Sequence, residues 1–198
     1  SDVCSSDLDT VDGALECMDD TEDLREVMKV CVDRCYSMSR FITNFANVVK
    51  IPEPQLQLVS LNDRVAACKM FMETVCRNRN ITLHLTLCDE NPHVRMDTSL
   101  FEQVLVNIIK NAAESIGEEG NIFIRTSVFP TMLEIADTGA GISKEVEAKL
   151  FSPFFSTKPN GQGIGLIFIR EVLMKHGCTF SLRTYSDGLT RFRIRFSA

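Results

Sequence analysis

Three short segments rich in asparagine or glycine lie in one stretch of this chain, between residues 107 and 166. Residues 107–111 read Asn-Ile-Ile-Lys-Asn and lie within an apolar helical pattern. Residues 137–141 read Asp-Thr-Gly-Ala-Gly and directly follow the strand-like residues 132–136. Residues 161–165 read Gly-Gln-Gly-Ile-Gly and open another apolar helix. Carboxamides on a helix, an acid at a strand end and glycines at a helix start together suit a magnesium nucleotide.

Asn107 and Asn111 are four residues apart, so they share one face of the predicted helix. Asparagine in a helix interior has a cost in helix propensity, and two at this spacing among Ile and Val invite an explanation. The carboxamide oxygen of Asn111 can complete an octahedral Mg²⁺ shell with phosphate oxygens and water. Alternatively, both side chains cap or bridge neighbouring backbone groups. The spacing alone does not decide between these two interpretations.

Asp137 is predicted to end its strand just before a glycine-containing turn. A carboxylate at that point can accept a hydrogen bond from an exocyclic amine, which would select adenine over guanine. Gly139 and Gly141 let the backbone approach a flat base, because no Cβ stands in the way. As an isolated string, D-x-G-x-G is a weak signal, since many turns contain it.

Gly161, Gly163 and Gly165 precede a predicted helix, whose free N–H groups and positive dipole end suit an anion. No strand leads directly into this segment, and no Lys-Ser/Thr follows it, so it is neither a Rossmann fingerprint nor a P-loop. The preceding span 143–163 is rich in phenylalanine and contains Lys158. We interpret it as a mobile lid that brings Lys158 near the terminal phosphate. Core packing is the alternative role for the phenylalanines, and the two roles can coexist.

The N-terminal residues 1–50 are predicted to form an α-helical hairpin. The second helix carries a heptad seam, whose members are Leu24, Met28, Cys31, Cys35, Met38, Ile42, Phe45 and Val49. A lone hairpin cannot bury so wide a stripe, so we expect two chains to pair into a four-helix bundle. Alternatively, the stripe packs on the chain's own second domain. Pro52 and Pro54 end the long helix, which places a linker at residues 51–57.

Residues 58–198 are predicted to form an α+β domain with an open mixed sheet covered by helices on one face. Residues 81–87 alternate strictly between apolar and polar, as a half-buried strand does. His84 falls on the polar phase of this strand, and His93 is expected in the loop that follows; both are interpreted as surface residues. Asp97 is expected to begin the helix that carries the two asparagines. Further strands are predicted at 121–128, 131–136, 178–185 and 190–196.

Composition excludes several classes of function. The net charge is −6 and no run of Lys and Arg exceeds two residues, which argues against binding nucleic acid or a membrane surface. No apolar stretch approaches the roughly 20 residues needed to span a bilayer. The eight cysteines include no C-x-x-C pair, and the three histidines have no zinc-finger spacing. We therefore expect free, buried thiols in a reducing cytosol.

Residues 97–198 resemble, in order, the N, G1, F and G2 boxes of the GHKL ATPase superfamily. Within it, the chain is similar to the catalytic ATP-binding domain of sensor histidine kinases. The resemblance implies the Bergerat fold, a two-layer α/β sandwich. It implies that Asn111 holds Mg²⁺, Asn107 assists with the phosphates and Asp137 binds the adenine amine of ATP. The residues implied to line the base and phosphates are Gly139, Gly141, Ile142, Gly161, Gly163, Gly165 and Leu166. Thr190 falls where relatives place a hydroxyl that joins the adenine through water.

Two departures from the family pattern shape the predicted activity. The kinases carry a phospho-accepting histidine, followed by an acid, on the first hairpin helix. Here the histidines, at 84, 93 and 176, all lie in the nucleotide domain. We therefore expect a truncated hairpin and a chain that binds ATP but cannot phosphorylate itself. Relatives that hydrolyse ATP (gyrase, MutL, Hsp90) have a general-base Glu where this sequence has Asn107. A carboxamide cannot take a proton from water, which favours phosphoryl transfer over rapid hydrolysis.

The resemblance implies the cytoplasmic catalytic part of a two-component sensor histidine kinase. The ATP γ-phosphoryl would pass to a histidine and then to the receiver domain of a response regulator. The implied partners are a second copy of the chain, through the hairpin, and that regulator. The full-length protein can be membrane-anchored under this interpretation, although these residues are not. The alternatives are another GHKL kinase or ATPase, which the heptad hairpin disfavours, and a scaffold without catalysis, which the intact glycines, Asn111 and Asp137 disfavour.

Overall fold

The computed structural model describes residues 22–49, 51–152, 155–157 and 163–197. The chain divides into two compact units, residues 1–50 and residues 51–198, and each is described by itself. The boundary falls at Ile51, beside Pro52 and Pro54. The predicted first helix of the hairpin lies outside the described residues.

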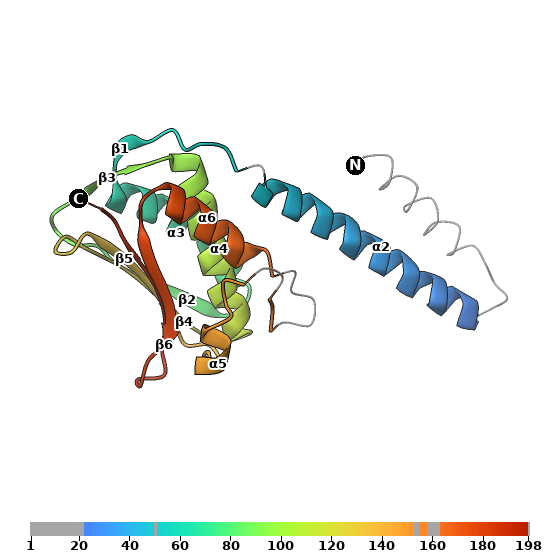
Figure 1. The fold of residues 1–198 in the computed structure, drawn as a ribbon. Helices are drawn as coiled ribbons and strands as arrows, with labels where there is room; N and C mark the ends of the chain where they lie inside the picture. The colour runs from blue at the N-terminus through green and yellow to red at the C-terminus, as the bar shows by residue number, and fades with distance from the viewer. Residues whose placement is uncertain (1–21, 50, 153–154, 158–162, 198) are drawn as a thin grey trace. The chain divides into compact units, whose positions relative to one another are not determined.

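The first unit contains the long helix α2 (Glu22–Val49; Figure 1). With 28 residues and a rise of 1.5 Å per residue, α2 is about 42 Å long. Three residues of the predicted seam, Met28, Met38 and Ile42, are 37%, 65% and 59% exposed in the single chain. Part of the predicted seam is therefore exposed on α2.

The second unit is built on a five-stranded mixed sheet with the order β2-β4-β5-β7-β6. The strands are β2 (Ile81–Thr86), β4 (Gly120–Ser127), β5 (Met132–Asp137), β6 (Thr179–Thr184) and β7 (Thr190–Arg195). β2 and β4 run parallel, and the other neighbours run antiparallel. The helices α3 (Leu61–Arg77), α4 (Thr98–Ile116) and α6 (Gly165–Lys175) cover one face of this sheet (Figure 1). This architecture confirms the predicted α+β fold class, a two-layer sandwich.

Strand alternation explains which face of the sheet is covered. In β2, Ile81 and Leu83 are buried while His84 is exposed, as the strict alternation predicted. His84 contacts its neighbour strand at the surface: its Nε2 lies 2.8 Å from Asn121 Oδ1, and its ring stacks on Phe123. The interpretation of His84 as a surface residue is therefore correct.

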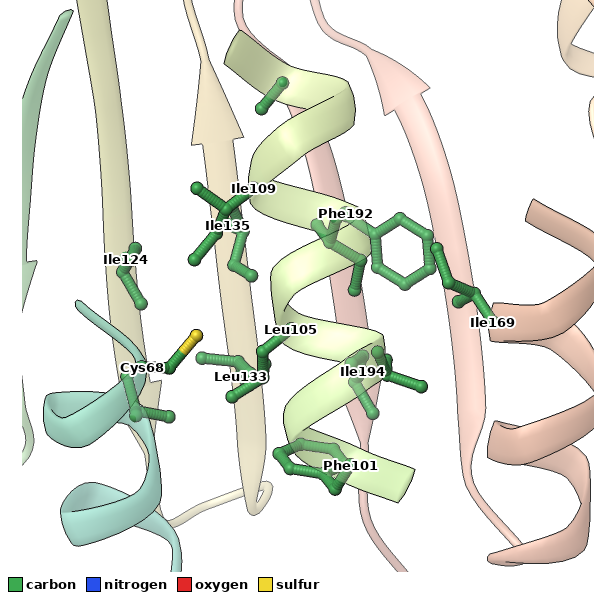
Figure 2. Close-up of a cluster of buried hydrophobic side chains, with 14 of the residues drawn as sticks. Cys68, Phe101, Leu105, Ile109, Ile124, Leu133, Ile135, Ile169, Phe192 and Ile194 are labelled. Atoms are coloured by element: carbon green, nitrogen blue, oxygen red, sulfur yellow. The ribbon is translucent and has the colours of Figure 1, made fainter. Parts of the chain in front are cut away.

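Helix α4 lies at the centre of the core. Asp97 caps it, because the Asp97 carboxylate accepts the backbone N–H groups of Ser99 and Leu100, both at 3.1 Å. Figure 2 shows Leu105 and Ile109 of α4 pointing toward the sheet residues Leu133 and Ile135, which are buried with them. Burial of each such side chain contributes about 1.5–3 kcal/mol, so the sheet fixes α4 firmly in place.

The structure differs from the sequence prediction around residue 93. His93 begins the short strand β3 (His93–Met96), which pairs antiparallel with β1 (Gln57–Ser60) as a two-stranded ribbon. The loop prediction for His93 was therefore wrong, although the residue is exposed as expected. Four residues between Pro92 and the cap at Asp97 are too few to display a clear alternation. A one-turn helix, α5 (Lys144–Glu147), also escaped prediction.

The described cysteines are free thiols, as predicted. Cys68, Cys76 and Cys178 are buried, and burial raises the pKa of Cys68 and of Cys178 to about 11, which keeps both thiols protonated. The expectation of burial was wrong for Cys31 and Cys35, because both are exposed on α2. These two belong to the seam that we expected a second chain to cover.

Among the helices that the structure describes, none has the length and apolar character needed to cross a membrane.

Candidate nucleotide-binding site

Asn107 and Asn111 are half-buried on α4, and the opposite face of this helix is anchored by the buried Leu105 and Ile109. Asn107 Nδ2 donates to the Gln103 carbonyl one turn earlier, at 2.9 Å. That bond leaves the carbonyl oxygen of the Asn107 side chain free to accept. Within the described part of the chain, no hydrogen bond holds the Asn111 carboxamide. A half-buried carboxamide without a protein partner suits a metal ion or a ligand, as the magnesium prediction requires.

Asp137 is the last residue of β5 and is buried, with 6% of its surface exposed. Its Oδ1 accepts the backbone N–H of Gly139 at 2.9 Å. Burial raises the pKa of the Asp137 carboxyl to about 6, and the Gly139 N–H opposes this rise only in part. The second carboxylate oxygen has no hydrogen-bond partner among the described residues. No fully buried side-chain oxygen of these residues lacks a partner, so this oxygen is reachable from solvent and open to a ligand.

The loop 138–143 after Asp137 is pressed against the end of α4. A Cβ added at Gly139 would lie 2.3 Å from Ser115 Oγ and 2.8 Å from the Ser115 carbonyl carbon, so only glycine fits there. The backbone N–H of Ala140 donates to the Ser115 carbonyl at 3.3 Å. Ser115 lies one turn beyond Asn111 on the same face of α4. The loop that follows Asp137 therefore contacts the helix that carries Asn107 and Asn111.

The other side of the same loop is held by the sheet. Gly141 has a φ of +81°, and the backbone N–H of Ile142 donates to Thr184 Oγ1 at 2.7 Å. Thr184 Oγ1 lies 2.9 Å from Thr190 Oγ1, and Thr190 is directly opposite Asp137 in the register of β5 and β7. Thr190 is only 3% exposed. Thr190 begins β7 and Asp137 ends the antiparallel neighbour β5, so both side chains lie at the same end of the sheet, on its helix-covered face.

The start of α6 has an uncapped first turn. Ile164 precedes the helix with no side-chain hydrogen bond to it, and Gly163 adopts a φ of +64°. A Cβ on Gly165 would meet nothing within 4 Å, so this end of the helix has open space beside it. Leu166 is half-buried and packs against the core. Two further predicted site residues, Lys158 and Gly161, lie outside the described residues.

Contacts between α4 and α6 fix the spacing of the asparagine helix and the glycine-led helix. At the far end, the Asp97 backbone N–H donates to His176 Nε2 at 3.0 Å, and His176 Nδ1 donates to the Val172 carbonyl at 2.7 Å. His176 thus links the start of α4 to the end of α6. In the middle of α6, Arg170 Nη1 donates to the Phe151 carbonyl at 2.8 Å. Phe151 itself packs against Phe180, so core packing accounts for this phenylalanine.

The structure thus brings Asp137, Gly139, Gly141, Ile142 and Thr190 together at one end of the sheet. Ser115 connects this group with the helix of Asn107 and Asn111. Ser115 and Thr184 are functional candidates that sequence reasoning missed, because neither lies in a glycine segment and no periodicity marks a contact across elements. The only local signal was the position of Thr184 at the end of a predicted strand.

These features define an α+β domain with a buried acid at a strand end, two half-buried carboxamides on a neighbouring helix and an uncapped helix start. The sequence matches the family described as histidine kinase-, DNA gyrase B- and HSP90-like ATPase over residues 96–198, more than half of the 198-residue chain. The chain therefore belongs to this family of ATPases.

Similar proteins agree with this assignment. Sensor histidine kinase ZraS of Salmonella typhimurium is 27% identical over 168 residues, which are 83% of this chain and 36% of that protein. The chain thus spans about a third of this curated relative. The catalytic domain of histidine kinase ThkA aligns with a TM-score of 0.66 and 28% identity, over 72% of this chain and 95% of that structure. The structure of ThkA in complex with response regulator protein TrrA has a similar fold, with a TM-score of 0.72 and 22% identity, over 98% of this chain and 58% of that structure.

Proposed function

We propose that this chain is the ATP-binding catalytic part of a two-component sensor histidine kinase. In the whole protein, the ATP γ-phosphoryl would pass to a histidine outside these 198 residues and then to an aspartate on a response regulator's receiver domain. One observation carries the proposal: the Ser115–Gly139 contact joins the carboxamide helix to the strand that ends in a buried Asp137. The names of the relatives, which are sensor histidine kinases, support it.

Each proposed role follows from the chemistry of the side chain. The Asp137 carboxylate accepts a hydrogen bond from the adenine amine, and Thr190 reaches the same base through water. Asn111 holds Mg²⁺ through its carboxamide oxygen, and Asn107 assists the phosphates through the oxygen that its bond to Gln103 leaves free. Mg²⁺, when bound, would neutralise charge on the phosphates. Lys158 is proposed to lie near the terminal phosphate. The remaining wall residues are Gly139, Gly141, Ile142, Gly161, Gly163, Gly165 and Leu166.

Phosphoryl transfer is favoured over hydrolysis by the side chain at position 107. A general base must accept a proton from the attacking water, and a carboxamide does not do so at neutral pH. The exposed apolar residues of α2 favour a kinase for a second reason, since they suit a helical dimerisation module. A different ATPase of the family, or a nucleotide-binding scaffold, would need neither the carboxamide at position 107 nor the exposed apolar residues of α2. We further propose that the chain acts in the cytoplasm, where the ATP is.

Labelled ATP tests the proposed activity. A longer form of the protein that includes the upstream helix should incorporate γ-phosphoryl label that is lost in acid and retained in base, as phosphohistidine is. The 198-residue chain alone should remain unlabelled while it binds ATP. A matched long form with Asp137→Asn serves as the control and should incorporate no label. Acid-stable label, or rapid release of phosphate without incorporation, would show that the protein is another kind of kinase or an ATPase.

Dimerisation through α2 gives a separate prediction. In light scattering the chain should have the mass of a dimer, because the exposed stripe of Met28, Met38 and Ile42 needs a partner helix. Replacing Cys35 and Ile42 together by aspartate should give a monomer, since charge on both would oppose burial. The control is Asp33→Ala together with Arg34→Ala, which alters exposed residues off the seam. A wild-type chain that stays monomeric at high concentration would refute the pairing.

A further inference from the structure

We propose that Thr184 is a positioning residue for adenine recognition, which acts by seating the loop 138–143 and by setting the donor direction of the Thr190 hydroxyl. Thr184 lies at the end of β6, outside the glycine and asparagine segments. The inference rests on the proposed function, because it assigns a specificity-determining part to a residue that would not touch the nucleotide itself.

Thr184 holds the loop by two kinds of contact. Its Oγ1 accepts the Ile142 backbone N–H at 2.7 Å, a short bond for an amide donor. A Cβ on Gly141 would lie 3.4 Å from both Cγ2 and Oγ1 of Thr184, so the backbone of the loop rests directly on this side chain. The loop 138–143 is therefore held between Ser115 of α4 on one side and Thr184 of β6 on the other, which fixes its position at the end of the sheet.

The Thr184 hydroxyl also determines the direction in which the neighbouring Thr190 hydroxyl donates its hydrogen bond. A hydroxyl group has one hydrogen to donate and two lone pairs. Thr184 uses one lone pair on the Ile142 N–H. Among the residues that the structure describes, the hydroxyl hydrogen of Thr184 has one acceptor in reach, Thr190 Oγ1 at 2.9 Å. When Thr184 donates in this pair, the hydrogen of Thr190 remains free to donate to a third group.

A hydrogen-bond donor at Thr190 beside an acceptor at Asp137 matches the donor and acceptor pattern of adenine and conflicts with that of guanine. Asp137, directly across the register from Thr190, offers an acceptor, so the two strand ends offer an acceptor and a donor next to each other. Adenine carries an amine donor beside the ring acceptor N1, whereas guanine carries a carbonyl acceptor beside an N1–H donor. A water between Thr190 and the base preserves the match, because a water that accepts from Thr190 donates onward. Without Thr184, Thr190 is free to turn and the donor is no longer fixed.

Calorimetric titration of the full chain with ATP and with GTP, both with Mg²⁺, tests the inference. Thr184→Val keeps the shape of the side chain and removes the hydroxyl. Thr184→Ala removes the hydroxyl with a different side chain and serves as a second variant. Either variant should weaken ATP binding about tenfold, the size expected for one lost hydrogen bond and one stranded N–H group. GTP binding should change less, so the preference for ATP should fall. Thr184→Ser should restore both the affinity and the preference.

Thr179→Val is the matched control, because Thr179 is exposed at the other end of β6. It should leave both affinities unchanged. Wild-type affinity and base preference in the Thr184 variants would overturn this inference alone. An equal loss of ATP and GTP binding with a lower melting temperature would also overturn it, since a purely structural role has that signature. A wild-type chain that binds neither nucleotide would instead overturn the proposed function on which the inference rests.

Discussion

Replacing Asp137 with asparagine should weaken ATP binding by roughly a hundredfold or more and, at the same time, make the chain more stable. The variant side chain still accepts the Gly139 N–H through its carbonyl oxygen. Its NH₂ group replaces the second carboxylate oxygen and would face the amine of adenine, donor against donor. Calorimetry at pH 7.5 should therefore detect no ATP binding. Wild-type affinity should also decrease as the pH falls through about 6, because the Asp137 carboxyl then gains a proton.

The gain in stability follows from the raised pKa. The Asp137 carboxyl has a pKa of about 6 in the folded chain and an ordinary value of 3.8, so the folded state binds the proton more tightly. The contribution of this carboxyl to stability is therefore greatest at low pH and falls as the pH rises from about 4 to about 6. Above that range the buried charge has a cost of roughly 3 kcal/mol, which asparagine does not have. The melting temperature of Asp137→Asn at pH 7.5 should exceed the wild-type value by several degrees.

Asp89→Asn is the matched control, because Asp89 is exposed in the loop between β2 and β3. It should leave both ATP affinity and melting temperature unchanged. An Asp137→Asn variant with wild-type ATP affinity would remove Asp137 from the adenine site. A variant that loses ATP binding but is also less stable than the wild type would show that the carboxylate supports the fold, which is incompatible with a site kept ready for a ligand.

Replacing Asn111 with alanine should remove most of the effect of Mg²⁺ on ATP binding. In the wild-type chain, Mg²⁺ should strengthen binding, because the half-buried Asn111 carboxamide has no hydrogen-bond partner in the described structure and can take a place in the metal shell. Groups that merely support metal ligands contribute about 10- to 100-fold in affinity, so loss of a ligand should cost at least tenfold. Titrations with Mg²⁺ and with a chelator measure this difference directly.

The same variant should not unfold. Alanine has a higher helix propensity than asparagine, and Asn111 makes no described hydrogen bond whose loss would destabilise α4. Lys110→Ala, an exposed neighbour on the same helix, is the control and should keep the magnesium dependence. Retention of that dependence in Asn111→Ala would contradict the metal assignment and would favour the alternative in which the asparagines serve the helix backbone.

The sequence predicted most of the fold because its core elements have clear periods. The alternation of residues 81–86 and the apolar positions of α4 each matched the observed burial. The short strand β3 was missed because four residues between a proline and a helix cap show no period. The exposure of Cys31 and Cys35 was also missed, because a heptad pattern indicates which side chains share a face but not whether that face is covered within one chain.

The candidate site was predictable only where a residue type carries its own chemistry. An acid after a strand, asparagines on a helix and glycines before a helix can be recognised in the sequence, and the structure places Asp137 and Thr190 opposite each other. The supporting residues Ser115, Thr184 and His176 could not be recognised in this way. Their importance comes from contacts between elements far apart in the chain, such as the bond from Ile142 to Thr184 and the bond from Asp97 to His176.

A crystal structure of the chain with Mg²⁺ and a non-hydrolysable ATP analogue tests the central claim most directly, namely that carboxylate, carboxamides and glycine loop hold one nucleotide together. The account predicts the adenine amine within hydrogen-bond distance of an Asp137 carboxylate oxygen, Asn111 in the metal shell and the phosphates at the start of α6. A nucleotide bound elsewhere on the domain, or one whose base does not contact Asp137, would contradict it.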